Sequence, residues 1–349
     1  MVLAGDIGGT KTTFALYNED EGRFKPLHSQ TFASREYPDF FSVIDAFLTG
    51  PRAYLSSGNN HHQTIQTACF GIAGPIFNQQ CTATNLPWIM DAQQISRRYA
   101  IPTVHFLNDL EATAYGTLTL PKTAVLCLNT EADLEAATVP PGNRAVIAAG
   151  TGLGEAMLYW HGAAYHPSAS EGGHSDFAPR NPTEIALLEY LLKRHSRVSY
   201  ERVLSGPGLF TVYEFMKQSG RGGEPAWLTE RLASEDPAAV ISEVALAEQS
   251  DLCVCTLDLF VSLLGAEAGN LALKCLATGG MYLGGGIAPK ILPKLKDGTF
   301  MKAFLHKGRF SSLLAKIPVW VILDPQTALH GAAQFALSNE GIGHIPRPT

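Results

Sequence analysis

The chain has 349 residues, a length at which one hydrophobic core usually gives way to two packed units. Hydrophobic residues make up 46% of it and charged residues 17%, an ordinary composition for a globular protein. The formal net charge of −6 argues against nucleic acid as the main partner, and no basic run is dense enough to indicate a membrane surface as partner.

Cysteine usage and hydropathy bear on where the protein works. Six cysteines are few for this length and form no disulfide framework, so we expect a reducing, cytoplasmic location. The first residues lack the positively charged segment and long apolar run of a secretory signal. The most apolar stretch, Leu252 to Leu264, is too short to span a bilayer and contains Asp258. It predicts a buried helix.

In the first half of the chain, strand patterns alternate with helix patterns. Predicted strands cover residues 3–7, 12–17, 27–32, 67–72 and 104–107. Predicted helices run from about residue 40 to Gly50, from Asp91 through Tyr99, and onward from Asp109. This alternation favours an α/β fold with parallel strands.

The opening pattern then starts again. A strand at 145–149, a glycine turn at 150–154 and a strand at 155–160 repeat it, which indicates a duplicated architecture. The rest is mostly helical, with a helix start at Asn181 and a long helical tract from Ala238 to Leu276. The remaining predicted elements are a strand at 279–283, a helix with Pro289 near its start, a strand at 319–323 and a helix from Thr327.

Three glycine-rich turns are candidate phosphate sites. They are Gly5-Asp6-Ile7-Gly8-Gly9-Thr10, Gly150-Thr151-Gly152-Leu153-Gly154 and Gly284-Gly285-Gly286. Glycine allows close approach to a ligand, and successive backbone N–H groups can bind anionic oxygens. The first turn is not a P-loop, because Thr10 stands where that motif requires glycine and a strand pattern follows it where the motif requires a helix. Each turn alone could be an ordinary hairpin.

Asp6 is the one acidic residue in its apolar strand. A carboxylate beside a phosphate loop is repulsive unless a cation lies between them, and Mg²⁺ is commonly held by one or two carboxylates together with phosphates and water. We therefore expect Asp6 to hold Mg²⁺ through water. The alternative is a turn aspartate that bonds to its own backbone.

Asn108 and Asp109 stand where a predicted strand gives way to a helix. Ligands of open α/β sheets bind beyond the carboxyl ends of the strands, so Asp109 is a candidate general base for a substrate hydroxyl. The alternative is that the pair only caps the helix.

The segment Glu171-Gly172-Gly173-His174 joins a carboxylate to an imidazole through two glycines. Both side chains can hydrogen-bond to hydroxyl groups, which suits a polyhydroxylated substrate. A metal site is the alternative, although no cysteine or second histidine follows at ligand spacing. A further segment, from Glu201 to Gly208, is by itself a helix–turn–helix junction.

Taken in order, these segments resemble the bacterial-type glucokinase family of the hexokinase and actin-like ATPase clan. The resemblance covers nearly the whole chain and rests on these segments: Gly5–Thr10, Phe70–Pro75, Thr84–Trp88, Leu107–Asp109, Ala149–Gly154, Glu171–His174, Glu201–Gly208 and Gly284–Gly286.

The resemblance implies a two-domain actin-like ATPase (ribonuclease H-like) α/β fold with an interdomain cleft. Residues 1–108 and 326–349 would form a small domain and residues 109–325 a large one. The implied activity is ATP-dependent phosphorylation of glucose at its 6-hydroxyl, with ATP and Mg²⁺ as cofactors, in a cytoplasmic, glycolytic homodimer.

The resemblance also implies the roles of individual residues. Asp109 would be the catalytic base, and Asn108, Glu171, His174 and Glu201 would bind the sugar. The nucleotide would bind to Gly5, Asp6, Gly8, Gly9, Thr10, Gly150, Thr151, Gly152, Gly285 and Gly286, with Mg²⁺ held by Asp6 through water.

Three alternatives remain open from the sequence. One is a kinase for another hexose, such as mannose or an N-acetylhexosamine. Another is a non-catalytic sugar sensor, although such regulators carry a DNA-binding segment before the phosphate loop, which here begins at Gly5. The third is a cytoskeletal or chaperone-like ATPase, which has no use for the cluster of Asn108, Asp109, Glu171 and His174.

Overall fold

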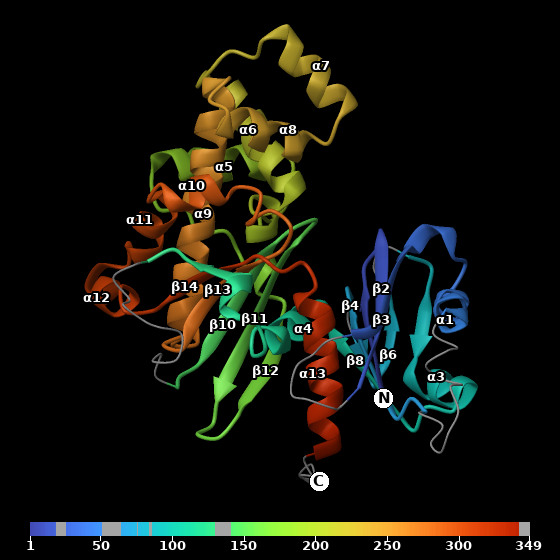
Figure 1. Cartoon of the computed structure of the whole chain (residues 1–349). Helices are drawn as coiled ribbons and strands as arrows, with labels where there is room; N and C mark the ends of the chain where they lie inside the picture. Colours follow the sequence, from blue (N-terminus) through green and yellow to red (C-terminus); the bar gives the residue numbers. More distant parts are fainter. Residues whose placement is uncertain (19–25, 51–63, 75, 84–85, 130–140, 342–349) are drawn as a thin grey trace. The chain divides into compact units, whose positions relative to one another are not determined.

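The structure is a computed structural model, and it describes residues 1–18, 26–50, 64–74, 76–83, 86–129 and 141–341. Pro75, Thr84 and Asn85, which belong to the motifs above, lie outside the described residues. The chain forms two compact units, unit 1 with residues 1–121 and 326–349 and unit 2 with residues 122–325. Each unit is built on its own mixed sheet (Figure 1).

The sheet of unit 1 has five strands in the order β3-β2-β1-β4-β8. They are β1 (Val2–Ile7), β2 (Lys11–Tyr17), β3 (Pro26–Ala33), β4 (Thr67–Ile72) and β8 (Thr103–Asn108). The first three strands pair antiparallel, as the predicted opening hairpin requires, and β1, β4 and β8 run parallel. Ile7 is in register with Ile72, and Ile72 with Asn108, so the three parallel strands end together at one edge.

Helices cover both faces of this sheet. On one face, α1 (Phe40–Thr49) and α3 (Ala92–Tyr99) pack against apolar side chains of the strands. Their starts are capped by Asp39 and Asp91, whose carboxylates accept backbone N–H groups of the first turn. On the other face lie α4 (Asp109–Gly116) and α13 (Thr327–Gly341). Three short strands, β5 (Ile76–Phe77), β6 (Gln80–Thr82) and β7 (Ile89–Asp91), form a separate small sheet.

The helices α4 and α13 lie side by side because glycines let their backbones approach (Figure 1). A Cβ on Gly331 would stand 1.7 Å from the carbonyl oxygen of Ala112, and one on Gly116 would stand 2.0 Å from that of Thr327. This packing fixes α4, and with it Asp109 at the start of α4, against the sheet.

Unit 2 repeats the strand order of unit 1. Its sheet has the order β12-β11-β10-β13-β14-β9. The strands are β9 (Val125–Cys127), β10 (Arg144–Ala149), β11 (Leu153–Trp160), β12 (Tyr165–Ser170), β13 (Gly280–Gly284) and β14 (Val319–Ile322). As in unit 1, three consecutive strands pair antiparallel. The first of them, β10, pairs parallel with β13, and β13 pairs parallel with β14. The duplication predicted from the sequence is therefore confirmed, with β9 added antiparallel at the far edge.

Most helices of unit 2 pack against one long central helix, α9 (Asp251–Lys274) (Figure 1). The other helices of the unit are α5 (Pro182–Leu192), α6 (Gly206–Gln218), α7 (Ala226–Ser234), α8 (Pro237–Leu246), α10 (Leu292–Lys296), α11 (Thr299–Leu305) and α12 (Ser311–Leu314). Among the described residues, α9 alone has the length and hydropathy to cross a membrane, but most of its apolar stretch is buried inside the unit. The predicted buried helix is confirmed.

Two sequence expectations in this region are wrong. The helical tract from Ala238 to Leu276 is broken between α8 and α9, where Glu248 has a φ of 54° and Ser250 caps the new helix. No helix begins near Pro289, because residues 285–291 form turns and α10 starts at Leu292. Gly285 has a φ of 81°, outside the helical region, and the N–H of Ile287 donates to the carbonyl oxygen of Ala149 at 3.3 Å.

Candidate active site

The first glycine turn, between β1 and β2 in unit 1, is shaped by hydrogen bonds from behind. The N–H of Gly8 donates to the carbonyl oxygen of Lys11 at 3.0 Å. Ser34, which is fully buried, donates its N–H to the oxygen of Thr10 at 3.0 Å and its hydroxyl to that of Gly8 at 2.8 Å. Sequence reasoning missed Ser34, because it lies beyond β3 and reaches the turn only in the folded unit.

Asp6 and Asp109 lie near this turn. Asp6 precedes the last residue of β1, and Asp109 directly follows β8, whose end is in register with those of β4 and β1. Burial, and secondly the negative charge of Asp109, together raise the pKa of the Asp6 carboxyl to about 6. The two carboxyl groups are therefore close enough to interact.

Asp109 begins α4, and its backbone is held there by two local features. The N–H of Leu110 lies 2.9 Å from a side-chain oxygen of Asn108 and 2.9 Å from one of Asp109. Gly71 on β4 has no side chain to hold the helix away, since a Cβ there would stand 2.8 Å from that of Ala112. Asn108 caps the helix, as the simpler interpretation of this pair requires. A sugar contact by Asn108 and a catalytic role of Asp109 stay predictions.

The chemistry of Asp6 fits a hard divalent cation. Its carboxyl has a neighbouring acid, and a cation between them would offset both the desolvation and the repulsion that raise its pKa. Within the described ranges, no group of three or more His, Cys, Asp or Glu side chains could hold a metal ion. Any Mg²⁺ at Asp6 would therefore take its other ligands from water and from nucleotide phosphates.

In unit 2, the second glycine turn joins β10 to β11. The N–H of Gly150 donates to the oxygen of Gly152 at 2.9 Å, and the N–H of Gly206 at the start of α6 donates to the oxygen of Gly150 at 2.8 Å. Gly285 packs against the end of β10, since a Cβ there would stand 2.3 Å from the oxygen of Ala149. Unit 2 thus brings the turn at 150–152, the start of α6 and the turn at 284–286 together.

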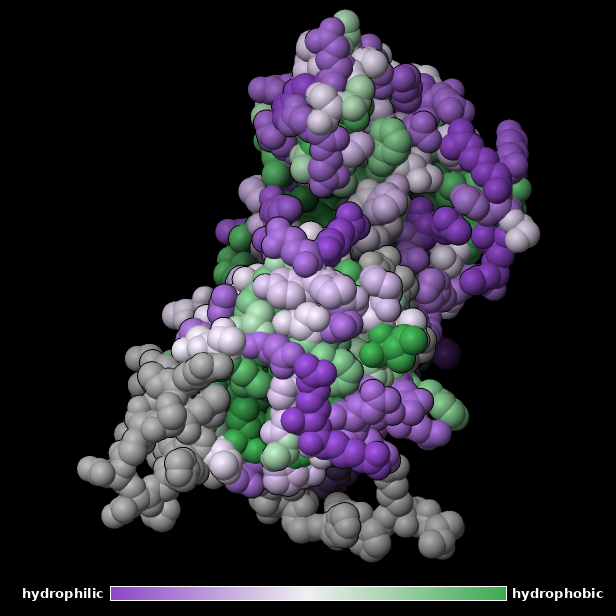
Figure 2. Space-filling model, turned by 90° about the vertical axis from the view of Figure 1, so that its right-hand side faces the viewer, coloured by the Kyte–Doolittle hydropathy of each residue, from purple (hydrophilic) through white to green (hydrophobic). Residues whose placement is uncertain are grey.

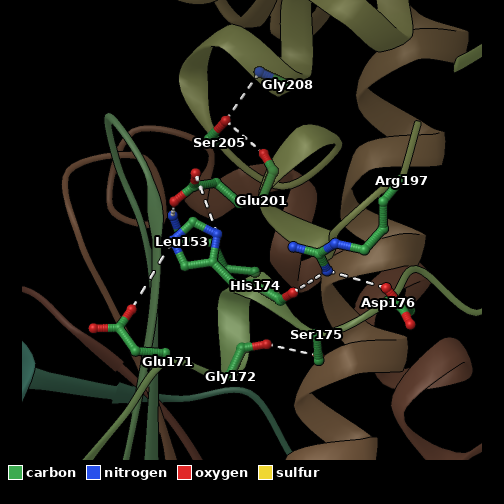
Figure 3. A network of polar contacts seen from close by, with 10 residues as sticks. All are labelled: Leu153, Glu171, Gly172, His174, Ser175, Asp176, Arg197, Glu201, Ser205 and Gly208. Carbon is green, nitrogen blue, oxygen red and sulfur yellow. Dashed lines mark hydrogen bonds and ion pairs between the residues drawn. The ribbon is translucent and has the colours of Figure 1, made fainter. Parts of the chain in front are cut away.

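The predicted sugar ligands of unit 2 form one cluster (Figure 3). The imidazole of His174 lies between two carboxylates, with Nε2 3.9 Å from Glu171 and Nδ1 4.0 Å from Glu201. The side chains of Glu171, His174 and Glu201 are 74%, 53% and 34% exposed, so a ligand can reach all three. Glu201 also accepts the N–H of Leu153 at 3.0 Å, directly after the second glycine turn.

Backbone contacts hold this cluster in place. Arg197 donates to the carbonyl oxygen of His174 at 2.5 Å and to the carboxylate of Asp176 at 3.0 Å (Figure 3). Ser205 donates to the carbonyl oxygen of Glu201 at 2.8 Å and accepts the N–H of Gly208, so it caps α6. Sequence reasoning missed Arg197, since no spacing rule connects it to His174.

Close packing, and not only backbone freedom, requires glycine at positions 172 and 173. A Cβ on Gly173 would stand 2.0 Å from the carbonyl oxygen of Leu153, and one on Gly172 would stand 2.0 Å from a carboxyl oxygen of Glu155. Both distances are below any real contact, so the segment passes β11 at a distance that only glycine allows.

Comparisons with known proteins show the family to which this chain belongs. A family model described as Glucokinase matches residues 3–339. A glucokinase of Synechocystis is 42% identical, with 96% of this chain and 97% of that protein covered, and one of Trichormus variabilis is 39% identical, with 96% and 98% covered. A crystal structure of glucokinase from an Antarctic psychrotroph superposes with a TM-score of 0.80 at 29% identity, covering 97% of this chain and 98% of that one.

Proposed function

Because the chain belongs to the glucokinase family and is an ATP-dependent glucose kinase of the actin-like ATPase fold, we propose that Asp109 is its general base. The position of Asp109 supports this role. It lies just past the end of β8, at the edge of the sheet where the glycine turn between β1 and β2 also lies. The sugar would be held by Asn108, Glu171, His174 and Glu201.

In the proposed reaction, the 6-hydroxyl oxygen of glucose attacks the γ-phosphorus of ATP, and the bond from that phosphorus to the bridging oxygen of ADP breaks. Asp109 accepts the hydroxyl proton as the new oxygen–phosphorus bond forms, giving glucose 6-phosphate. Phosphoryl transfer requires positioning and charge stabilisation more than covalent help, and backbone N–H groups of glycine turns can supply both. The turns at Gly8–Thr10 and Gly150–Gly152 are proposed for this role.

The nucleotide contacts are proposed on the same basis. Gly5, Asp6, Gly8, Gly9 and Thr10 would line the nucleotide site from unit 1. The contacts from unit 2 would be made by Gly150, Thr151, Gly152, Gly285 and Gly286. The packing of Gly285 on Ala149 supports one site for these two turns of unit 2. Mg²⁺ would be held by Asp6 through water, and when bound it would neutralise phosphate charge.

We further propose that the enzyme is a cytoplasmic, glycolytic homodimer whose partners are glucose and ATP rather than nucleic acid or membrane. All six cysteines are free, which fits a reducing compartment. Exposed apolar side chains support self-association, since Phe77 and Ile89 on the small sheet are 78% and 75% exposed. Hydrophobic patches also lie between hydrophilic ones on the face shown in Figure 2. Light scattering on a size-exclusion column tests the homodimer by its molar mass. The double variant Phe77→Ser/Ile89→Ser tests whether these two side chains are needed for it.

The single observation that carries the site is the cluster of Glu171, His174 and Glu201. Calorimetric titration with glucose tests it directly. We expect Glu171→Ala and His174→Ala each to weaken binding, whereas Asp176→Asn, beside the cluster, changes it less. Unchanged affinity in both alanine variants contradicts the site. A coupled assay over a panel of sugars, with ATP, ADP and polyphosphate as donors, then defines substrate and donor range.

A further inference from the structure

Beneath the sugar cluster lies a buried carboxyl group that the reaction does not use. Glu155 on β11 is 1% exposed and pairs across the sheet with Ser170, the last residue of β12. We call residues 171–174, which follow β12, the sugar loop. A Cβ on Gly172 would stand 2.0 Å from Oε2 of Glu155, so the carboxyl packs directly against the backbone of this loop. Gly172 also donates its N–H to the hydroxyl of Ser170 at 2.9 Å.

The other side of Glu155 faces a second buried acid, Glu267 on α9. Glu267 is fully buried and accepts hydrogen bonds from Lys274 at 3.0 Å and from Asn270 at 2.7 Å. Glu155 has no ion pair among the described residues, and its Oε1 has no hydrogen-bond partner there. Among the described residues, Lys274 is therefore the one cation that lowers the pKa of Glu155.

Of the other cations around this pair, Lys307 acts on Glu267, and none of those in the described ranges acts on Glu155. Cys275 follows α9 and is close enough for the charge of Glu155 to raise its pKa. The hydroxyl of Tyr200 and the ammonium of Lys307 both bond to Asn270, and both also interact with the carboxylate of Glu267. Arg180 is committed to Glu184 and Ser262.

The electrostatics of Glu155 follow from this arrangement. Burial raises the pKa of its carboxyl to about 7, the charge of Glu267 raises it in the same direction, and Lys274 opposes both. Below about pH 7 the carboxyl therefore mostly carries a proton and can donate it in a hydrogen bond to Glu267. Above neutral pH it ionises beside a second carboxylate, against the backbone of the sugar loop.

We propose that Glu155 is a positioning residue for sugar binding, whose protonated carboxyl, bonded to Glu267, supports Gly172 and so holds Glu171 and His174 in place. Ionisation of Glu155 displaces the loop and weakens glucose binding. The inference rests on the sugar-binding role proposed above for Glu171 and His174, and it adds a proton-dependent support that the family's sugar ligands do not themselves provide.

The test compares wild type with Glu155→Gln, whose side chain keeps the shape of the protonated acid but cannot ionise. Glucose affinity is measured by calorimetry without nucleotide, from about pH 6 to about pH 8.5. Every other group titrates in both proteins, so the ratio of the two dissociation constants isolates Glu155. We expect wild type to lose affinity relative to Glu155→Gln as the pH rises through about 7, by up to roughly tenfold for each pKa unit of coupling. A ratio that is independent of pH overturns the proposal.

A second variant, Glu267→Gln, should move the pH at which glucose affinity is lost in a defined direction, which a purely structural role of Glu155 does not predict. It removes the repulsive charge and leaves Lys274 near Glu155, so the pKa of Glu155 falls and the loss of affinity moves to lower pH. An unmoved midpoint contradicts the pairing. In steady-state assays the pH-dependent loss of affinity should appear as a higher KM for glucose, while kcat stays unchanged.

Two controls separate this inference from the proposed function and from misfolding. Glu171→Ala should lose affinity at every pH. If it keeps affinity, the proposed sugar site fails. If it loses affinity while Glu155→Gln follows wild type, only the positioning role fails. Thermal unfolding supplies a readout without sugar, because the raised pKa makes ionised Glu155 destabilising. Glu155→Gln should gain melting temperature over wild type at about pH 8, and the gain should vanish toward about pH 4, below the ordinary pKa of 4.5.

Discussion

The carboxylate of Glu201 accepts the backbone N–H of Leu153 at 3.0 Å, and Leu153 directly follows the glycine turn at 150–152. A Cβ on Gly152 would stand 2.6 Å from the same carboxylate oxygen. The other oxygen of Glu201 lies 4.0 Å from Nδ1 of His174. One side chain of unit 2 therefore touches both the proposed sugar site and the proposed phosphate turn.

Replacing Glu201 should consequently affect both substrates. In Glu201→Ala the KM for glucose should rise by roughly 10- to 100-fold, the usual effect of losing a charged hydrogen-bond partner, and the KM for ATP should rise as well because the turn loses its anchor. Glu201→Gln keeps an oxygen for Leu153 and should spare the KM for ATP. Steady-state kinetics with each substrate varied in turn distinguish these effects. If alanine raises only the KM for glucose, the link between the two sites is wrong.

Asp109 gives a cleaner separation of binding from chemistry. We expect Asp109→Asn to lower kcat by about 10²- to 10⁴-fold, because the amide cannot accept the hydroxyl proton. Glucose affinity should be largely kept, since the proposed sugar ligands remain in place. The matched control is Asp45→Asn, which removes an exposed acid paired with Arg98 in the same unit. Near-normal turnover of Asp109→Asn refutes the assignment of the base.

Local chemistry explains what could be predicted from the sequence. Asp91 and Asn181 cap helices because a short polar side chain reaches the free N–H groups of the first turn, and that preference is visible in any sequence. The strand–glycine–strand pattern likewise predicted both hairpins and a duplicated architecture. These features depend on neighbours a few residues apart.

Contacts between distant segments explain what could not be predicted. The turns after Gly285 replace a helix because this segment packs on the end of β10, far away in sequence. Ser34 and Arg197 belong to the site through hydrogen bonds to Gly8 and His174, which no spacing rule reveals. The catalytic and ligand roles themselves came from family resemblance and stay predictions until they are tested.

Helix packing in unit 1 predicts an effect on stability. In Gly331→Ala the new methyl group would meet the oxygen of Ala112 at 1.7 Å, so α13 must move away from α4. We expect a loss of about 1–3 kcal/mol in the free energy of unfolding, as for other overpacked sites. Gly223→Ala is the control, because a Cβ there has nothing within 4 Å. Urea unfolding curves of the two variants that coincide contradict this packing.

Asp6 predicts opposite effects on stability and activity. Its folded-state pKa of about 6 lies above the ordinary value of 3.8, so its stabilising contribution is present at low pH and is lost as the pH rises through 6. Without Mg²⁺, Asp6→Asn should therefore be more stable than wild type above about pH 6, by about 1–3 kcal/mol, and equally stable near pH 4. Its kcat with Mg²⁺ and ATP should be lower.

Magnesium titrations check the same residue from the other side. A proton on Asp6 competes with the cation, so the Mg²⁺ concentration needed for half-maximal activity of wild type should rise below about pH 6. Chelation with EDTA should abolish turnover, and adding Mg²⁺ back should restore it. If Asp6→Asn has the same Mg²⁺ requirement as wild type at every pH, Asp6 takes no part in holding the cation.

Arg197 is a positioning residue, and its replacement should have a small and specific effect on glucose binding. One guanidinium nitrogen, Nη1, bonds both to the carbonyl oxygen of His174 and to Asp176, a position that the shorter side chain of lysine reaches only in part. Because the side chain is 56% exposed, we expect Arg197→Ala to raise the KM for glucose only about 3- to 10-fold, with kcat kept, and Arg197→Lys to fall between it and wild type. Asp176→Asn leaves the bond to His174 and should have less effect than Arg197→Ala. A fall in kcat at saturating glucose would instead mean that Arg197 acts on the transferring group.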